Sequence, residues 1–159
     1  MSVFPSWPGS NTQQAHGSSG VDAAVKNTNG AVGYVDVYYG VTANLQFMKI
    51  RNKAGYFINP TTATIAAASK IDTTPKDNGE LSIVNPPNTA AYQKAYPIST
   101  VSFVLVPKKV GDPTKATLVK SFVKYALTTG QKAAPNLFYA ELPSSITSPA
   151  VTAVASASA

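Results

Sequence analysis

The sequence predicts an α/β protein, for three reasons. Residues 32–37 and 101–106 have the β-branched and aromatic composition of buried strands. A stretch of helical periodicity precedes the first of these segments, and another follows the second, which is typical of alternating helices and strands. A length of 159 residues with 44% hydrophobic and 13% charged residues suffices for one domain with a core.

Composition excludes several classes of protein and site. The chain has no cysteine, so it builds neither a disulfide scaffold nor a cysteine zinc site. His16 is the single histidine, and no nucleophile and base are paired by spacing, so we expect no metal, no cofactor and no enzyme activity. No run of about 18 apolar residues is present, as an integral membrane protein would need.

The net charge of +6 indicates either a basic surface that aids solubility or attraction to anions such as phosphate and acidic lipid. The basic residues are scattered and never form a run of five, so no nucleic-acid partner is expected.

The N-terminal part is predicted to be a loop over residues 1–19, followed by a short helix over 20–28. Ser18 or Ser19 is expected to cap this helix, and Asp22 is expected in its first turn. The glycine of Asn29-Gly30 should end it, before the predicted buried strand at 32–37. One face of the helix is apolar, with Val21, Ala24 and Val25.

The middle of the chain combines short extended pieces and one helix. Residues 38–44 are ambiguous and compatible with a short helix, whereas 47–52 alternate as a half-buried strand and 56–59 form a brief extended piece. Pro60 lies near the start of a second helix, and 70–80 read as a loop.

The C-terminal part has the clearest pattern. Residues 101–106 predict a central strand between Pro97 and Pro107. Asp112 and Pro113 open the most regular helix, which Gly130 ends or kinks. A packed loop and a terminal helix or frayed end follow. The loop residues expected to dock on the core are Leu137, Phe138, Tyr139 and Leu142.

Few residues suggest chemistry. Ser18, Ser19 and Gly20 follow His16 at a helix start, where backbone N–H groups either hold an anion or receive a simple cap. Asp36 faces either a cleft or a salt-bridge partner. An aromatic cluster either lines a pocket or packs in the core or on a sheet surface: Tyr34, Tyr38 and Tyr39.

Five stretches in order resemble one family. They are Ser6-Trp-Pro-Gly with Gly17-Ser-Ser-Gly-Val-Asp-Ala-Ala-Val, Asn29-Gly-Ala-Val-Gly-Tyr-Val-Asp, Ile50-Arg-Asn-Lys-Ala-Gly-Tyr-Phe-Ile-Asn-Pro, Tyr96-Pro-Ile-Ser-Thr-Val-Ser-Phe-Val-Leu-Val, and Phe122-Val-Lys-Tyr-Ala-Leu-Thr-Thr-Gly-Gln with Tyr139-Ala-Glu-Leu-Pro. Together they resemble the C-terminal half of the PstS-type periplasmic phosphate-binding proteins of phosphate ABC transporters, which have a class II periplasmic-binding fold.

The resemblance implies a partial class II fold and a role in phosphate uptake. Residues 1–95 would be the later part of the second lobe, and 96–159 the C-terminal return to the first lobe. The implied partners are inorganic phosphate, a transporter permease, and a missing N-terminal half or a second copy. The implied location is periplasmic or at the cell surface. MSVFPSWPGS lacks the regions of a signal peptide, and the family's export signal lies far upstream.

The sequence departs from the family at the ligand residues. The family binds phosphate mainly through an N-terminal-lobe loop, a Ser and an Asp of that lobe, and an Arg…Ser-Gly-Thr motif. All of these lie upstream, so the phosphate-binding residues of this chain are unknown. Its own candidates are Ser18, Ser19 and Gly20. The alternative function is a reduced interaction or structural domain that does not bind phosphate by itself. The sequence leaves anion specificity and oligomeric state open.

Overall fold

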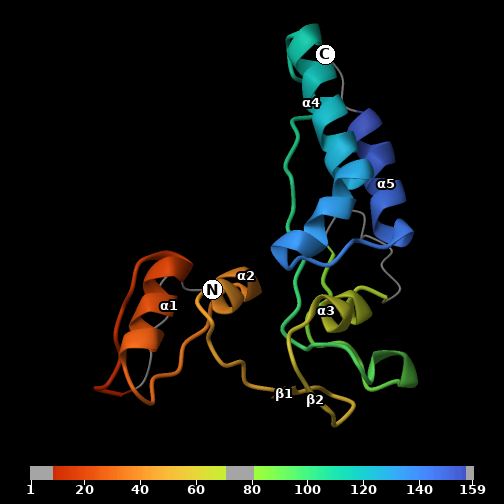
Figure 1. Cartoon of the computed structure of the whole chain (residues 1–159). Coiled ribbons are helices and arrows are strands. Elements are labelled where there is room, and N and C mark those ends of the chain that lie inside the picture. Colours follow the sequence, from red (N-terminus) through yellow and green to blue (C-terminus); the bar gives the residue numbers. More distant parts are fainter. Residues whose placement is uncertain (1–8, 71–80, 157–159) are drawn as a thin grey trace. The chain divides into compact units, whose positions relative to one another are not determined.

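The computed structural model describes residues 9–70 and 81–156. The expected loop at 71–80 and the apolar anchors Phe4 and Trp7 lie outside these ranges. Figure 1 shows helices joined by extended segments and one small hairpin. The elements in chain order are α1 (Gly17–Asn27), α2 (Val37–Thr42), β1 (Ile50–Arg51), β2 (Phe57–Ile58), α3 (Thr62–Ala68), the 3-10 helix η1 (Ala90–Tyr92), α4 (Pro113–Leu127), the 3-10 helix η2 (Thr129–Leu137) and α5 (Ser144–Ala155).

The chain divides into two compact units. The first is Met1–Phe47 and the second is Met48–Ala159. Each unit is described by itself below. The lobe boundary expected between residues 95 and 96 differs from this boundary between the two units, and it stays a prediction.

In the first unit, two glycines allow close packing. A Cβ at Gly33 would lie 2.7 Å from Val25 Cγ2 and 3.0 Å from Val21 Cγ1, so the chain crosses the apolar face of α1 at this point. A Cβ at Gly40 of α2 would lie 2.5 Å from Phe47. The predicted helix at 20–28 is therefore confirmed, beginning three residues earlier, and the ambiguous 38–44 stretch contributes to α2.

The predicted buried strand at residues 32–37 is wrong. The chain there is irregular until α2 begins at Val37, and Val32 is 72% exposed. Its composition is that of a strand, but no described segment pairs with it. A buried strand needs both a neighbour and cover, and composition supplies neither.

The second unit begins with a small antiparallel hairpin. Ile50 is opposite Ile58, and Arg51 is opposite Phe57. Gly55 has φ +90° in the connecting turn, a conformation that favours glycine. The extended pieces expected at 47–52 and 56–59 are confirmed as short strands within those ranges.

Helix α3 follows, with a capping box. The Thr61 hydroxyl accepts a hydrogen bond from Thr64 N at 3.2 Å, and the Thr64 hydroxyl accepts one from Thr61 N at 2.9 Å. This helix supplies Ala68 to a small core with Tyr92 and Ala95. Tyr96 N donates to the Thr64 carbonyl at 3.0 Å, which ties the chain after η1 to α3.

The predicted central strand at residues 101–106 is also wrong. The chain runs from residue 100 to 107 without regular structure, and Leu105 is 93% exposed. No described residue forms a ladder with this segment, so its apolar side chains have no sheet to enter.

Helix α4 is the most regular element, as predicted. Asp112 caps it, because its Oδ1 accepts hydrogen bonds from Thr114 N at 2.8 Å and Lys115 N at 3.1 Å. Pro113 occupies the first turn, where its missing N–H costs nothing. α4 packs against α5, and Ala116, Val123 and Ile146 are buried.

After α4 the chain turns through η2 and then runs without regular structure from residue 138 to 143, where the packed loop was expected. Gln131 links the residues before and after η2. Its Nε2 donates to the Ala126 carbonyl of α4 at 2.6 Å, and its Oε1 accepts from Leu142 N at 3.0 Å. The expected docking is wrong for Leu137 and Tyr139, which are about half exposed. Phe138 and Leu142 are partly buried. The terminal stretch forms α5, with Pro149 inside it.

Candidate functional site

The candidate anion residues Ser18, Ser19 and Gly20 lie in the first turn of α1. This helix begins at Gly17, whose φ of +66° turns the chain sharply into the helix. The N-cap is His16, and no side chain accepts a hydrogen bond there. The expectation that Ser18 or Ser19 caps the helix is therefore wrong, because both residues are already helical.

Three α-helices of the described chain have the side-chain cap that α1 and α5 lack. Side-chain oxygens of Asp36, Thr61 and Asp112 accept hydrogen bonds from the first turns of α2, α3 and α4. At α1 the first backbone N–H groups receive no such acceptor. Backbone amides and the helix dipole at this end can therefore interact with an external anion.

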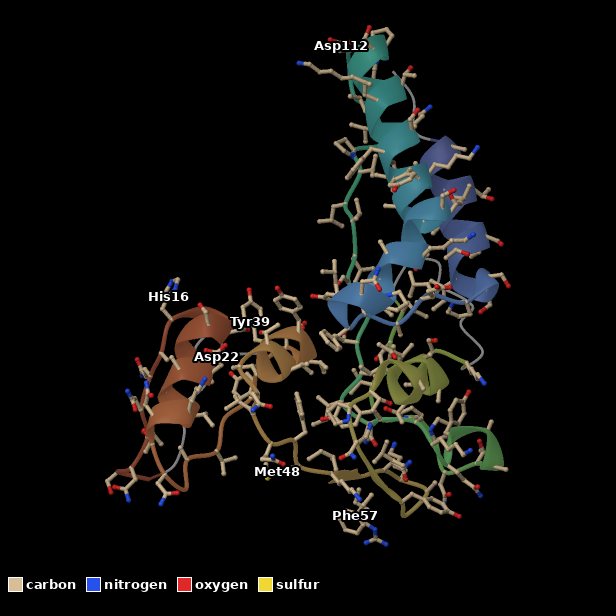
Figure 2. The ribbon with its side chains drawn as sticks, in the orientation of Figure 1. His16, Asp22, Tyr39, Met48, Phe57 and Asp112 are labelled. Atoms are coloured by element: carbon tan, nitrogen blue, oxygen red, sulfur yellow. The ribbon has the colours of Figure 1, made fainter. Side chains whose placement is uncertain are left out.

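His16 and Asp22 flank this turn along the chain, and Figure 2 labels both. His16 is exposed at the N-cap, whereas Asp22 is partly buried and lies beyond the first turn, contrary to expectation. Asp22 thus adds no charge to the first turn. Within residues 9–70 and 81–156, no cluster of His, Cys, Asp or Glu has the arrangement of a metal site.

Asp36 has a structural role that the sequence reasoning missed. It caps α2, because its Oδ1 accepts a hydrogen bond from Tyr38 N at 3.0 Å. Its expected place in a cleft or a salt bridge stays a prediction. An Asp directly before a helical stretch predicts an N-cap. The cap was missed because residues 32–37 were assigned to a strand.

The tyrosines around Asp36 do not share one environment. Tyr38 and Tyr39 are adjacent on α2, with ring centroids 5.4 Å apart and ring planes at 90°. Tyr34 is 70% exposed on the irregular segment before α2. The structure therefore brings two of the three rings together, in edge-to-face packing.

The side chain of Asn52 makes four hydrogen bonds in the described structure, and the sequence reasoning did not single it out. Its Nδ2 donates to the carbonyls of Tyr92, Gln93 and Ala95 at 3.2, 3.0 and 3.1 Å. Its Oδ1 accepts from Tyr56 N at 3.0 Å. Asn52 is buried and joins the hairpin to the chain around η1, so its role is to hold structure.

The surface charge is spread over several elements. Lys49, Arg51 and Lys53 are exposed around β1, and Lys115 and Lys124 are exposed on α4. Among the helices that the structure describes, none has the length and apolar character required to cross a membrane.

Comparison with known proteins supports one family. The family described as "PBP superfamily domain" matches residues 5–129. A phosphate-binding protein PstS of Xylella fastidiosa strain Temecula1 is 31% identical over 138 residues. That alignment covers 86% of this chain and 36% of the relative.

Two further relatives carry the same name. The protein of Haemophilus influenzae is 29% identical over 137 residues, which is 86% of this chain and 40% of the relative. That of Methanocaldococcus jannaschii is 33% identical over 145 residues, which is 79% of this chain and 35% of the relative. The chain thus spans roughly a third to two fifths of these relatives. Because the family match extends over most of its residues, the chain belongs to the PBP superfamily.

Proposed function

We propose that this chain is part of the substrate-binding component of a phosphate ABC transporter. The observation that carries the proposal is its similarity, at about 30% identity over most of its length, to proteins named as phosphate-binding. The net charge of +6 is compatible with an anionic ligand. The partners would be inorganic phosphate and a transporter permease, at a periplasmic or cell-surface location.

The proposed anion contact within this chain is the first turn of α1, at Ser18, Ser19 and Gly20. Two features support it. The turn has no side-chain cap of its own, and two of its residues, Ser18 and Ser19, carry hydroxyl groups of a kind that can donate to an anion. In this proposal residues 1–95 and 96–159 contribute to the second and first lobes, and the rest of the site comes from polypeptide beyond the matched region.

The test is isothermal titration of the chain with phosphate, with sulfate as the control anion and the mass in solution recorded. We expect phosphate binding that Ser19→Asp weakens about tenfold, because a carboxylate in the first turn competes for the same positive potential. Ser121→Asp is the matched control, since it adds the same charge on an exposed position of α4. It should leave binding unchanged.

The contrary results are equally specific. Equal heats for phosphate and sulfate would replace phosphate selectivity with general anion binding. Equal loss in both variants would remove α1 as the contact. A folded chain that gives no heat with either anion would overturn phosphate binding by this chain alone and favour the interaction or structural domain.

A further inference from the structure

The hairpin of β1 and β2 carries three cationic side chains that face water. Lys49 and Arg51 are two residues apart on an extended stretch, so they project from the same face, and Lys53 follows in the turn. All three are exposed. Within residues 9–70 and 81–156, none of the three forms an ion pair or a side-chain hydrogen bond. Their charges are therefore available to an external partner.

Large apolar side chains share the hairpin with these cations. Phe57 is opposite Arg51 in the ladder, so it lies on the same face, and its side chain is 66% exposed. Met48 and Tyr56, which directly precede Lys49 and Phe57, are 59% and 49% exposed. Figure 2 shows the Phe57 side chain pointing outward from the hairpin. We call Lys49, Arg51, Lys53 and Phe57 the outer hairpin face.

The opposite face of the hairpin is anchored to the rest of its unit. Ile50 and Ile58 are paired there and partly buried. Asn52, two residues after Ile50, binds the carbonyls around η1. The hairpin is thus fixed from behind, and its outer face is not used in packing within the unit.

The charge pattern restricts what can bind the outer hairpin face. Residues 37–70 contain no aspartate or glutamate, so no carboxylate of this stretch offsets the cations. A partner must be anionic, and it must also accept apolar side chains. The surface of a membrane with anionic lipid meets both requirements, because headgroups attract Lys and Arg while the headgroup–acyl boundary accepts aromatic side chains.

Other anionic partners meet these requirements less well. Dissolved inorganic phosphate offers charge but no apolar environment for Phe57. A single-stranded nucleic acid offers bases that stack on aromatic rings, but it binds along a longer basic groove. The basic residues nearest to the hairpin in the sequence are Lys26 and Lys70, so the cluster does not continue along the chain.

We propose that the outer hairpin face binds the surface of a membrane that contains anionic lipid. The three cations approach the headgroups, and Phe57 enters the headgroup–acyl boundary with Met48 and Tyr56 beside it. This inference goes beyond the proposed function, because it concerns lipid rather than phosphate and holds whether or not the chain binds phosphate.

The experiment is sedimentation of the full chain with vesicles of phosphatidylcholine and phosphatidylglycerol in equal parts, beside vesicles of phosphatidylcholine alone. We expect binding to the anionic vesicles to be stronger by at least about tenfold. Salt at about 1 M, where the Debye length falls to about 3 Å, should release most of the bound chain. Inorganic phosphate, compared with chloride at equal ionic strength, should release no more.

A pair of charge variants tests the location of the contact. Lys49→Ser/Lys53→Ser should weaken binding to the anionic vesicles by about twentyfold, because each cation near such a surface adds about fivefold. Lys115→Ser/Lys124→Ser is the matched control, since it lowers the net charge equally at exposed positions of α4. It should leave binding nearly unchanged.

A second pair tests the apolar contribution. Phe57→Ser should weaken binding by about tenfold, because the side chain no longer gains from leaving water. Ile98→Ser is its matched control, since Ile98 is also 66% exposed but lies outside the hairpin. It should have no effect. Circular dichroism of the four variants checks that they keep their helices.

Several outcomes would overturn the proposal. Equal binding to the neutral and anionic vesicles would remove the role of charge. Equal loss in the Lys115/Lys124 control would show a general effect of net charge rather than a contact at the hairpin. Tighter binding of a single-stranded oligonucleotide than of the vesicles, lost in Phe57→Ser, would assign the face to nucleic acid instead.

Discussion

Residues 92–99 and 101–106 are neighbours in the sequence and differ completely in environment. In the first segment Tyr92, Ala95 and Pro97 are buried. Its backbone is held from three directions: Asn52 binds the carbonyls near η1, Tyr96 N donates to Thr64, and the Pro97 carbonyl accepts from Asn85 N. The second segment is more uniformly apolar, yet most of its side chains are exposed.

The comparison teaches two things. Apolar composition determines which segments would gain free energy by burial, and the neighbours available in the fold determine which segments are buried. The first segment has polar partners within its own unit that satisfy its backbone, so it can leave water at little cost. The 101–106 segment has no described partner for its backbone and gains nothing by collapsing alone.

The largest expected effect is at Asn52. Asn52→Ala removes one acceptor and the donor shared by three carbonyls, including that of the fully buried Ala95. We expect a loss of about 2–4 kcal/mol in the free energy of unfolding, because buried polar groups would remain unpaired. Urea unfolding followed by circular dichroism measures it.

Asn59→Ala is the matched control, since Asn59 is exposed and its side chain makes no hydrogen bond within the described residues. It should change the free energy of unfolding by no more than about 0.5 kcal/mol. Equal effects of the two substitutions would show that the Asn52 bonds do not hold the first segment.

A smaller effect concerns alkaline pH. Burial raises the pKa of the Tyr96 phenol above its ordinary value of 10.0. As pH rises above 10, the unfolded chain loses this proton first, so the folded state loses stability. Tyr96→Phe should reduce the loss of unfolding free energy between pH 8 and pH 11. Identical losses in the variant and the parent would contradict a partly buried phenol at this position.

The smallest expected effect is at Leu105. Leu105→Ser removes a large apolar side chain that is 93% exposed, so the melting temperature of the isolated chain should barely change. The corresponding change in unfolding free energy is within about 0.5 kcal/mol, as for other exposed positions. A clear destabilisation would mean that residues 101–106 are already packed in solution.

Local patterns predicted the helices well. The Asp112-Pro113 start and the repeat after it defined α4, and the apolar face of α1 was assigned from Val21, Ala24 and Val25. These features depend on residues three or four apart, which the sequence contains directly. The pair Thr61 and Thr64 acts at the same range in α3.

Long-range features were predicted less well. Both long strands were assigned from composition at 32–37 and 101–106, and neither has a partner in the described structure. Asn52 was overlooked because the three carbonyls that its amide group binds lie 40 to 43 residues away. The candidate turn at Ser18 and Ser19 was located correctly at a helix start, but its uncapped state emerged only from the geometry at His16 and Gly17.

The sequence by itself determined the helix positions, the absence of cysteine chemistry and the resemblance that the family match confirmed. Tertiary structure alone decided which apolar segments are buried and which polar side chain holds the small core together. The physical reason is that helical hydrogen bonds are satisfied within a few residues, whereas a strand or a buried amide is satisfied only by distant parts of a chain.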